Sequence, residues 1–210
     1  MVYLYLIRHA ECEMNLAFTQ TIGGRSNESP LTPNGVSQSH KLGLRLQREG
    51  ISFKDTYSSI AVRTKETLKH AGVHNGFTLE DAIVTPDLQE LDQGDWEGAD
   101  RKATYTPEVV KEIQADPWNF KAPHGESQRD VEERMLEWTC ENITTRYRTE
   151  DSVGVFTHGI ATKCFLRGVL NFDPENTYKL HIDNTAITTL KHDDKGWHVL
   201  GINDASHIKE

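Results

Sequence analysis

A run of large aliphatic and aromatic residues, from Val2 to Ile7, ends directly on Arg8 and His9. Such a continuous run bounded by charge is typical of a strand that is buried in a parallel sheet. Ligands of open α/β sheets bind beyond the carboxyl ends of the strands. The pattern therefore predicts that Arg8 and His9 present a fixed cation and a nucleophilic nitrogen at a ligand-binding edge.

The rest of the chain alternates between strand and helix patterns, which indicates a single α/β domain over residues 1–210 with a mostly parallel sheet. Thr32 is the expected N-cap of a helix that has Pro33 in its first position and ends at Gly50. The other predicted strands cover residues 53–57, 83–88, 153–157, 186–190 and 197–202, and the other predicted helices cover residues 62–71, 126–148 and 161–168.

Residues 99–125 interrupt this alternation. They are polar and contain Pro107, Pro117 and Pro123, with one short predicted helix over residues 107–114. Long excursions of this kind often cover a binding site. We therefore expect this segment to lie outside the sheet and to cover a site.

Composition limits the classes of partner. The net charge of −9 argues against a nucleic-acid partner or an acidic membrane surface, because both need a basic protein surface. No secretory signal and no membrane-spanning stretch is visible, and the three cysteines lack metal-ligand spacing. We therefore expect a cytoplasmic protein. If its ligand is an anion, the positive side chains must cluster at the binding site.

Three downstream segments could contribute to such a site. The segment Thr157-His158-Gly159 again places a histidine after a strand and just before a helix, whose free N–H groups attract anions. Arg63 lies in the first turn of another predicted helix, and the arginine fork can bond two phosphate oxygens at once. An acidic segment follows, in which a carboxylic acid could donate a proton to a leaving oxygen. Spacing alone does not choose among its members, Glu90, Asp92, Asp95 and Glu97.

In this order, the motifs resemble those of the histidine phosphatase superfamily, also called the phosphoglycerate mutase-like family. The resemblance covers nearly the whole chain and is carried by residues 6–11 with Asn15, by residues 30–35, 58–67, 88–98 and 123–127, and by His158-Gly159. In the acidic segment, the residue that matches the family's proton donor is Glu90. The sequence departs from the family pattern at Ala10, where glycine is usual, and at His124, which replaces the first glycine of a "PGGES" element.

The resemblance implies a three-layer α/β/α fold, a phosphohistidine intermediate on His9, and a catalytic group made of His9, Arg8, Arg63, Glu90 and His158. It implies further substrate contacts from Asn15, Thr21 and the backbone of Gly159. No metal and no cofactor is expected, because arginines supply the positive charge that magnesium supplies in other phosphoryl-transfer enzymes.

The sequence favours a phosphatase that acts on a small phosphorylated metabolite. A phosphoglycerate-type mutase is the main alternative, but its relatives carry a longer basic insertion than the residues between Gly98 and Lys121. A phosphoprotein phosphatase and a non-catalytic phospholigand-binding protein are weaker alternatives. Arg25, Lys121 and His124 are candidate contacts for a second anionic group, although solvated side chains are the usual state of such residues. An edge strand near the C-terminus could pair two copies into a homodimer.

Overall fold

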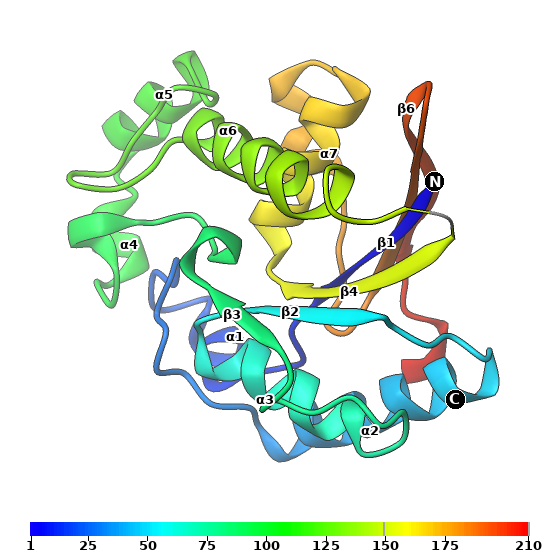
Figure 1. The fold of residues 1–210 in the computed structure, drawn as a ribbon. Helices are drawn as coiled ribbons and strands as arrows, with labels where there is room; N and C mark the ends of the chain where they lie inside the picture. The colour runs from blue at the N-terminus through cyan, green and yellow to red at the C-terminus, as the bar shows by residue number, and fades with distance from the viewer. Residues whose placement is uncertain (149, 210) are drawn as a thin grey trace.

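The strands of the central sheet lie in the order β3-β2-β4-β1-β5-β6 (Figure 1). The computed structural model describes residues 1–148 and 150–209. Its strands are β1 (Val2–Arg8), β2 (Asp55–Ser59), β3 (Ile83–Thr85), β4 (Asp151–Thr157), β5 (Ile187–Asp193) and β6 (Gly196–Asp204). The strands from β3 to β1 pair in parallel, whereas β5 and β6 are antiparallel additions. The predicted, mostly parallel sheet is confirmed, and the two strands followed by histidines are neighbours.

Helices cover both faces of this sheet. In Figure 1, α2 (Pro33–Arg48) and α3 (Val62–Gly72) lie on one side, and α6 (Gln128–Thr139) and α7 (Gly159–Leu170) lie on the other. Ile7 packs in the core cluster that contains α2 and α3 residues, whereas Leu4 and Leu6 pack in the cluster that contains α6 and α7 residues. Successive strand residues point to opposite faces, so two covered faces explain the continuous apolar run of β1. The three-layer α/β/α fold is therefore confirmed.

Three shorter helices lie in the connections. They are α1 (Glu13–Ala17), α4 (Arg101–Thr104) and α5 (Pro107–Ala115). Residues 99–125 hold α4 and α5 and form the green segment beyond the sheet in Figure 1. The sequence predicted α5, but α4 is too short to produce a periodic pattern. None of the helices in the described residues is long and apolar enough to cross a membrane.

The boundaries of most predicted elements shift in the structure, and the reason is clear for three of them. The strand predicted at 53–57 is β2, which begins at Asp55, because Phe53 precedes the strand and packs its ring against Gly154. The strand predicted at 83–88 ends at Thr85, where Pro86 opens a 3-10 turn. The helix predicted at 126–148 begins after the N-cap Ser127, and its α-helical part ends at Thr139, beyond which the backbone widens into a π-helical turn.

Candidate active site

The adjacent ends of β1 and β4 bring the two histidine motifs together. Arg8 pairs with Thr157 in the parallel register, and the His9 N–H donates to the Thr157 carbonyl at 3.0 Å. The ring centroids of His9 and His158 are therefore only 5.2 Å apart. Both side chains are buried, with 4% of His9 and none of His158 exposed. The sheet register alone thus places two histidines that are far apart in the sequence in one site.

His9 is held as a neutral imidazole with one free ring nitrogen. Its Nδ1 lies 2.8 Å from the Ala10 carbonyl oxygen, which can only accept, so Nδ1 carries the proton. Burial, followed by the charges of Arg63 and Arg8, lowers the pKa of His9 well below its ordinary value, and the bond to Ala10 opposes this only in part. The unprotonated Nε2 is therefore the atom with an available lone pair.

His158 has the opposite tautomer. Nη2 of Arg63 lies 3.1 Å from its Nδ1, and a guanidinium can only donate, so this Nδ1 is unprotonated. The proton sits on Nε2, which donates to the Ser59 hydroxyl at 2.9 Å. Burial and then the charge of Arg63 lower the pKa of His158 well below its ordinary value. His158 is thus a neutral residue that orients Arg63.

The two arginines are fixed by backbone carbonyls. Arg63, in the first turn of α3, donates to the carbonyls of Ser26 at 2.8 Å and Gly24 at 3.3 Å. Arg8 donates to the Ile182 carbonyl at 2.6 Å, but its buried Nε has no hydrogen-bond partner among the described residues. A buried donor without an acceptor is costly, and an anion would satisfy it. Gly159 adjoins this donor, since a Cβ built on it would lie 3.5 Å from the Arg8 Nε.

Glu90 lies across the start of α7. Its two oxygens accept from the backbone N–H groups of Ile160 and Ala161, each at 3.0 Å, and one also accepts from the Leu91 N–H. The first turn of α7, where the sequence predicted free N–H groups for a bound anion, therefore already holds this carboxylate. A helix N-terminus suits a carboxylate because its N–H groups lack intrahelical partners.

The structure separates the four acids between which spacing could not decide. Glu90 lines the cavity that also contains His9. Asp92 forms an ion pair with Arg25, Asp95 contacts His124, and Glu97 accepts from the N–H groups of Arg25 and Ser26. Glu90 is therefore the carboxylate of this segment that shares a cavity with His9, as the family resemblance predicted.

Most of the predicted site residues line one cavity of about 250 Å³. Among them are Arg8, His9, Asn15, Arg63 and Glu90. The Oδ1 of Asn15 accepts from the Cys12 N–H and from Nδ2 of Asn184, which also donates to the His9 carbonyl. Asn184 was missed by the sequence analysis, because it lies far along the chain in no recognisable motif. The remaining wall comes from Cys12, Met14, Phe18, Gly23 and Gly24.

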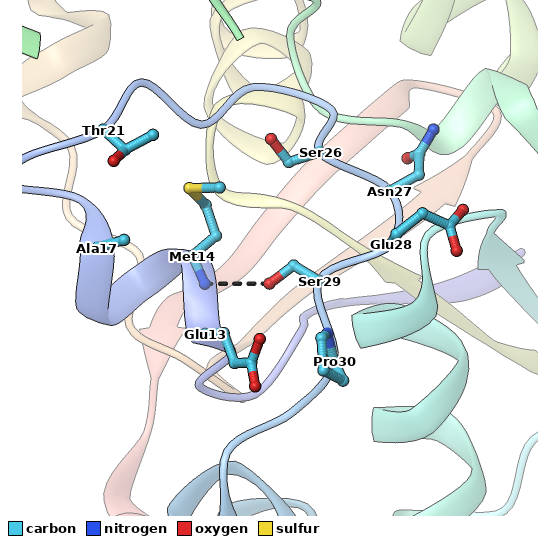
Figure 2. A pocket seen from close by; sticks show the side chains of 9 residues that line it. All are labelled: Glu13, Met14, Ala17, Thr21, Ser26, Asn27, Glu28, Ser29 and Pro30. Carbon is cyan, nitrogen blue, oxygen red and sulfur yellow. Dashed lines mark hydrogen bonds between the residues drawn. The ribbon is translucent and has the colours of Figure 1, made fainter. Parts of the chain in front are cut away.

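Thr21 does not belong to that cavity. Its N–H donates to the Ala17 carbonyl at the end of α1, and the residue forms an isolated bridge with Asp100. It lines a neighbouring open cavity of about 500 Å³, drawn in Figure 2, where the Met14 N–H donates to Ser29. The turn after α1 therefore places Thr21 in the wall of this neighbouring cavity, which shares Met14 with the cavity that contains His9.

The three side chains proposed as contacts for a second anion already contact carboxylates. Arg25 forms ion pairs with Asp92 and Glu126. Lys121 pairs with Asp130, and His124 pairs with Asp95. The sequence did not single out Arg101, which lines a further cavity of about 200 Å³ beside the first. Its signal, one arginine in a charged segment, is too weak to detect.

Comparisons with known proteins give a consistent result. The model of the histidine phosphatase superfamily (branch 1) matches residues 4–205. A 2,3-bisphosphoglycerate-dependent phosphoglycerate mutase from Azorhizobium caulinodans is 30% identical over 179 residues, which are 84% of this chain and 85% of the mutase.

Two solved structures show the same fold. YhfR from Bacillus stearothermophilus has 27% identity and a TM-score of 0.79, with 99% of this chain and 100% of that chain covered. A phosphoserine phosphatase from Entamoeba histolytica has 22% identity and a TM-score of 0.82 over 99% of this chain and 100% of that chain. The similarity to the second protein concerns the fold alone.

Proposed function

This chain belongs to the histidine phosphatase superfamily, and on that premise we propose that it is a metal-independent phosphomonoesterase. In this proposal, it hydrolyses a small phosphorylated metabolite through a phosphohistidine on His9. The observation that carries the proposal is the state of His9, a neutral buried imidazole whose Nδ1 is fixed by the Ala10 carbonyl and whose Nε2 is free. A nucleophile needs an unprotonated nitrogen, and this geometry provides one at neutral pH.

The proposed reaction has two displacements at phosphorus. Nε2 of His9 forms a bond to phosphorus while the bond from phosphorus to the alcohol oxygen breaks. The step uses Glu90 in its protonated form, which gives its proton to that oxygen and becomes a carboxylate. Glu90 then takes a proton from a water molecule, which attacks the phosphohistidine and releases inorganic phosphate.

Fixed cations stabilise both displacements in this proposal. Arg8 and Arg63 bind the phosphoryl oxygens, where the charge of the transition state is spread. His158 holds Arg63 in position, and Asn15 and the Gly159 N–H add neutral hydrogen bonds. Because backbone carbonyls already fix both guanidinium groups, little reorganisation is needed when the substrate binds.

A mutase is the second candidate, because the relative from Azorhizobium caulinodans is named as one. The same phosphohistidine would then return the phosphoryl group to a phosphoglycerate and not to water. Incubation with 3-phosphoglycerate and a bisphosphoglycerate primer separates the two. Isomer exchange that is much faster than phosphate release would replace the phosphatase proposal with the mutase.

Hydrolysis of p-nitrophenyl phosphate in EDTA tests the phosphatase proposal. We expect wild-type activity to survive chelation and His9→Ala to lose about a thousandfold or more in kcat, because the covalent step is lost. His198→Ala is the matched control. His198 lies on the edge strand β6, where it contacts Asp193, and the site lies at the ends of the central strands β1 and β4. An acid-labile phosphoenzyme should accumulate in wild type only. Activity retained by His9→Ala would overturn the assignment of the nucleophile.

A further inference from the structure

A second cavity continues from the one that contains His9. It has a volume of about 200 Å³ and shares Phe18, Gly23, Gly24 and Glu90 with the first. In the proposed reaction, Glu90 protonates the leaving oxygen, so the group attached to that oxygen extends from Glu90 into the second cavity. The walls of this cavity therefore face the alcohol part of the substrate.

These walls are mainly apolar and aromatic. Beyond the shared residues, they include Ile22, Leu91, Tyr105, Ile160 and Tyr178. Phe18 and Tyr178 leave 56% and 54% of their surface exposed. Large exposed aromatic side chains that gather at a cavity mark a binding surface, because covering them removes apolar area from water. This lining fits a flat apolar group better than a small polyol.

Arg101 is the cation of this cavity. Its backbone is anchored at the start of α4, where its N–H donates to the Gln20 carbonyl at 2.7 Å. Its guanidinium carbon lies 4.1 Å from the centroid of the Phe18 ring and 5.1 Å from that of Tyr105. Two aromatic rings therefore hold the guanidinium by cation–π contacts, which orient it without neutralising its charge.

The charge of Arg101 has no carboxylate partner in the described part of the chain. Its Nε is buried and makes no hydrogen bond to any described residue. Arg25 and Arg134 differ from Arg101 in having a carboxylate partner, since Arg25 pairs with Asp92 and Arg134 pairs with Glu126. Arg101 lines the cavity, and a guanidinium without a carboxylate partner is satisfied by an anionic group of a ligand.

We propose that the substrate is a phosphate monoester of an apolar, ring-containing alcohol that carries a second anionic group, and that Arg101 recognises this group. The inference rests on the phosphatase function proposed above and specifies its substrate class. Phe18, Tyr105 and Tyr178 cover the ring, and the guanidinium of Arg101 binds the anion at the far end of the leaving group. Arg101 is thus a specificity-determining residue.

A pair of aryl phosphates tests the inference. 4-Carboxyphenyl phosphate and 4-carbamoylphenyl phosphate have nearly the same shape and differ in the charge at the para position. The readout is the ratio of kcat/KM for the carboxylate ester to kcat/KM for the amide ester. It is measured for wild type, Arg101→Gln, Arg101→Lys and Lys102→Gln. Lys102 is the matched control, because it is the exposed neighbour of Arg101 and does not line the cavity.

We expect this ratio to fall about tenfold in Arg101→Gln, the size of a lost charge-assisted hydrogen bond, because only the carboxylate ester loses its charged partner. Arg101→Lys should retain part of the preference for the carboxylate ester. This variant keeps the inference testable if Arg101→Gln does not fold. Lys102→Gln should keep the wild-type ratio. A wild-type ratio in Arg101→Gln would overturn the inference and leave the phosphatase intact. Failure of the wild type on both esters, together with hydrolysis of p-nitrophenyl phosphate, would overturn the substrate class, whereas failure on all three esters would overturn the phosphatase proposal itself.

Discussion

At the scale of single residues, the two buried histidines divide their roles through opposite tautomers. His9 keeps its proton on Nδ1 because Ala10 offers a carbonyl, and His158 keeps its proton on Nε2 because Arg63 occupies its Nδ1. Both are neutral, so the positive charge of the cavity comes from Arg8 and Arg63. This arrangement separates nucleophilicity from anion binding, since His9 supplies the lone pair and the arginines supply the charge.

Glu90→Gln should discriminate between leaving groups. Without a proton donor, kcat for an alkyl phosphate should fall about a hundredfold or more, because an alkoxide is a poor leaving group. p-Nitrophenolate leaves without protonation, so the loss on p-nitrophenyl phosphate should be much smaller. Steady-state kinetics with both esters checks this. Equal losses on the two substrates would show that Glu90 does not act as the proton donor.

At the scale of elements, the start of α2 is built against the loop that follows His9. Thr32 caps the helix by accepting from the Gly35 N–H at 3.0 Å, and its own N–H donates to the Glu11 carbonyl. Gly35 packs so closely that a Cβ on it would lie 1.9 Å from the Glu11 carbonyl oxygen. The cap therefore fixes the loop that carries the nucleophile as well as the helix.

Gly35→Ala should consequently damage both stability and activity. The new methyl group meets backbone that no rotamer change can move, so we expect the free energy of unfolding to fall by about 1–3 kcal/mol. The matched control is Gly201→Ala in β6, where a Cβ meets nothing within 4 Å. Urea unfolding and p-nitrophenyl phosphate turnover measure both effects. If the two variants unfold at the same urea concentration, the close packing of α2 on this loop is not a constraint.

At the scale of the whole molecule, the sheet collects the site from segments that are distant in the sequence. His9 and His158 follow β1 and β4, Arg63 lies in the first turn of α3, and Glu90 lies in the connection after β3. Neighbouring parallel strands have their carboxyl ends at the same edge of the sheet. The residues that follow these strands therefore lie close together at that edge. The buried histidines are therefore part of the core as well as of the site, which couples global stability to pH.

Stability should decrease as the pH falls below about 6.5. An unfolded histidine binds a proton near that pH, but burial and the neighbouring arginines keep the native pKa values of His9 and His158 well below it. Below the unfolded pKa, the unfolded state therefore binds more protons than the native state, and acid favours unfolding. Each histidine should contribute about 1.4 kcal/mol per pH unit until the pH reaches its native pKa.

Urea unfolding between pH 7 and pH 5 measures this slope. The double variant His9→Asn/His158→Asn should lose most of it, whereas His181→Asn, at an exposed histidine, should keep it. A double variant with the wild-type slope would show that other groups cause the pH dependence.

The amino-acid sequence by itself determined the features that a few neighbouring residues encode. The apolar run of β1, the Thr32-Pro33 start of α2, and the histidines that follow β1 and β4 were all predicted because strand burial, capping and chain order are local properties. Family motifs added the three-layer fold. Boundaries that depend on packing were less accurate, as Phe53 shows, since its apolar side chain packs on Gly154 just before β2 begins.

Only the tertiary structure decided which polar groups meet. It placed Glu90, out of four nearby acids, in the cavity with His9, set the tautomers of His9 and His158, and placed Thr21 in a neighbouring cavity. It also left Arg101 between two aromatic rings, without a carboxylate partner among residues 1–148 and 150–209, while carboxylates paired with Arg25. These outcomes depend on contacts between residues far apart in the chain, and such contacts exist only after the crossovers have fixed the strand order and the register.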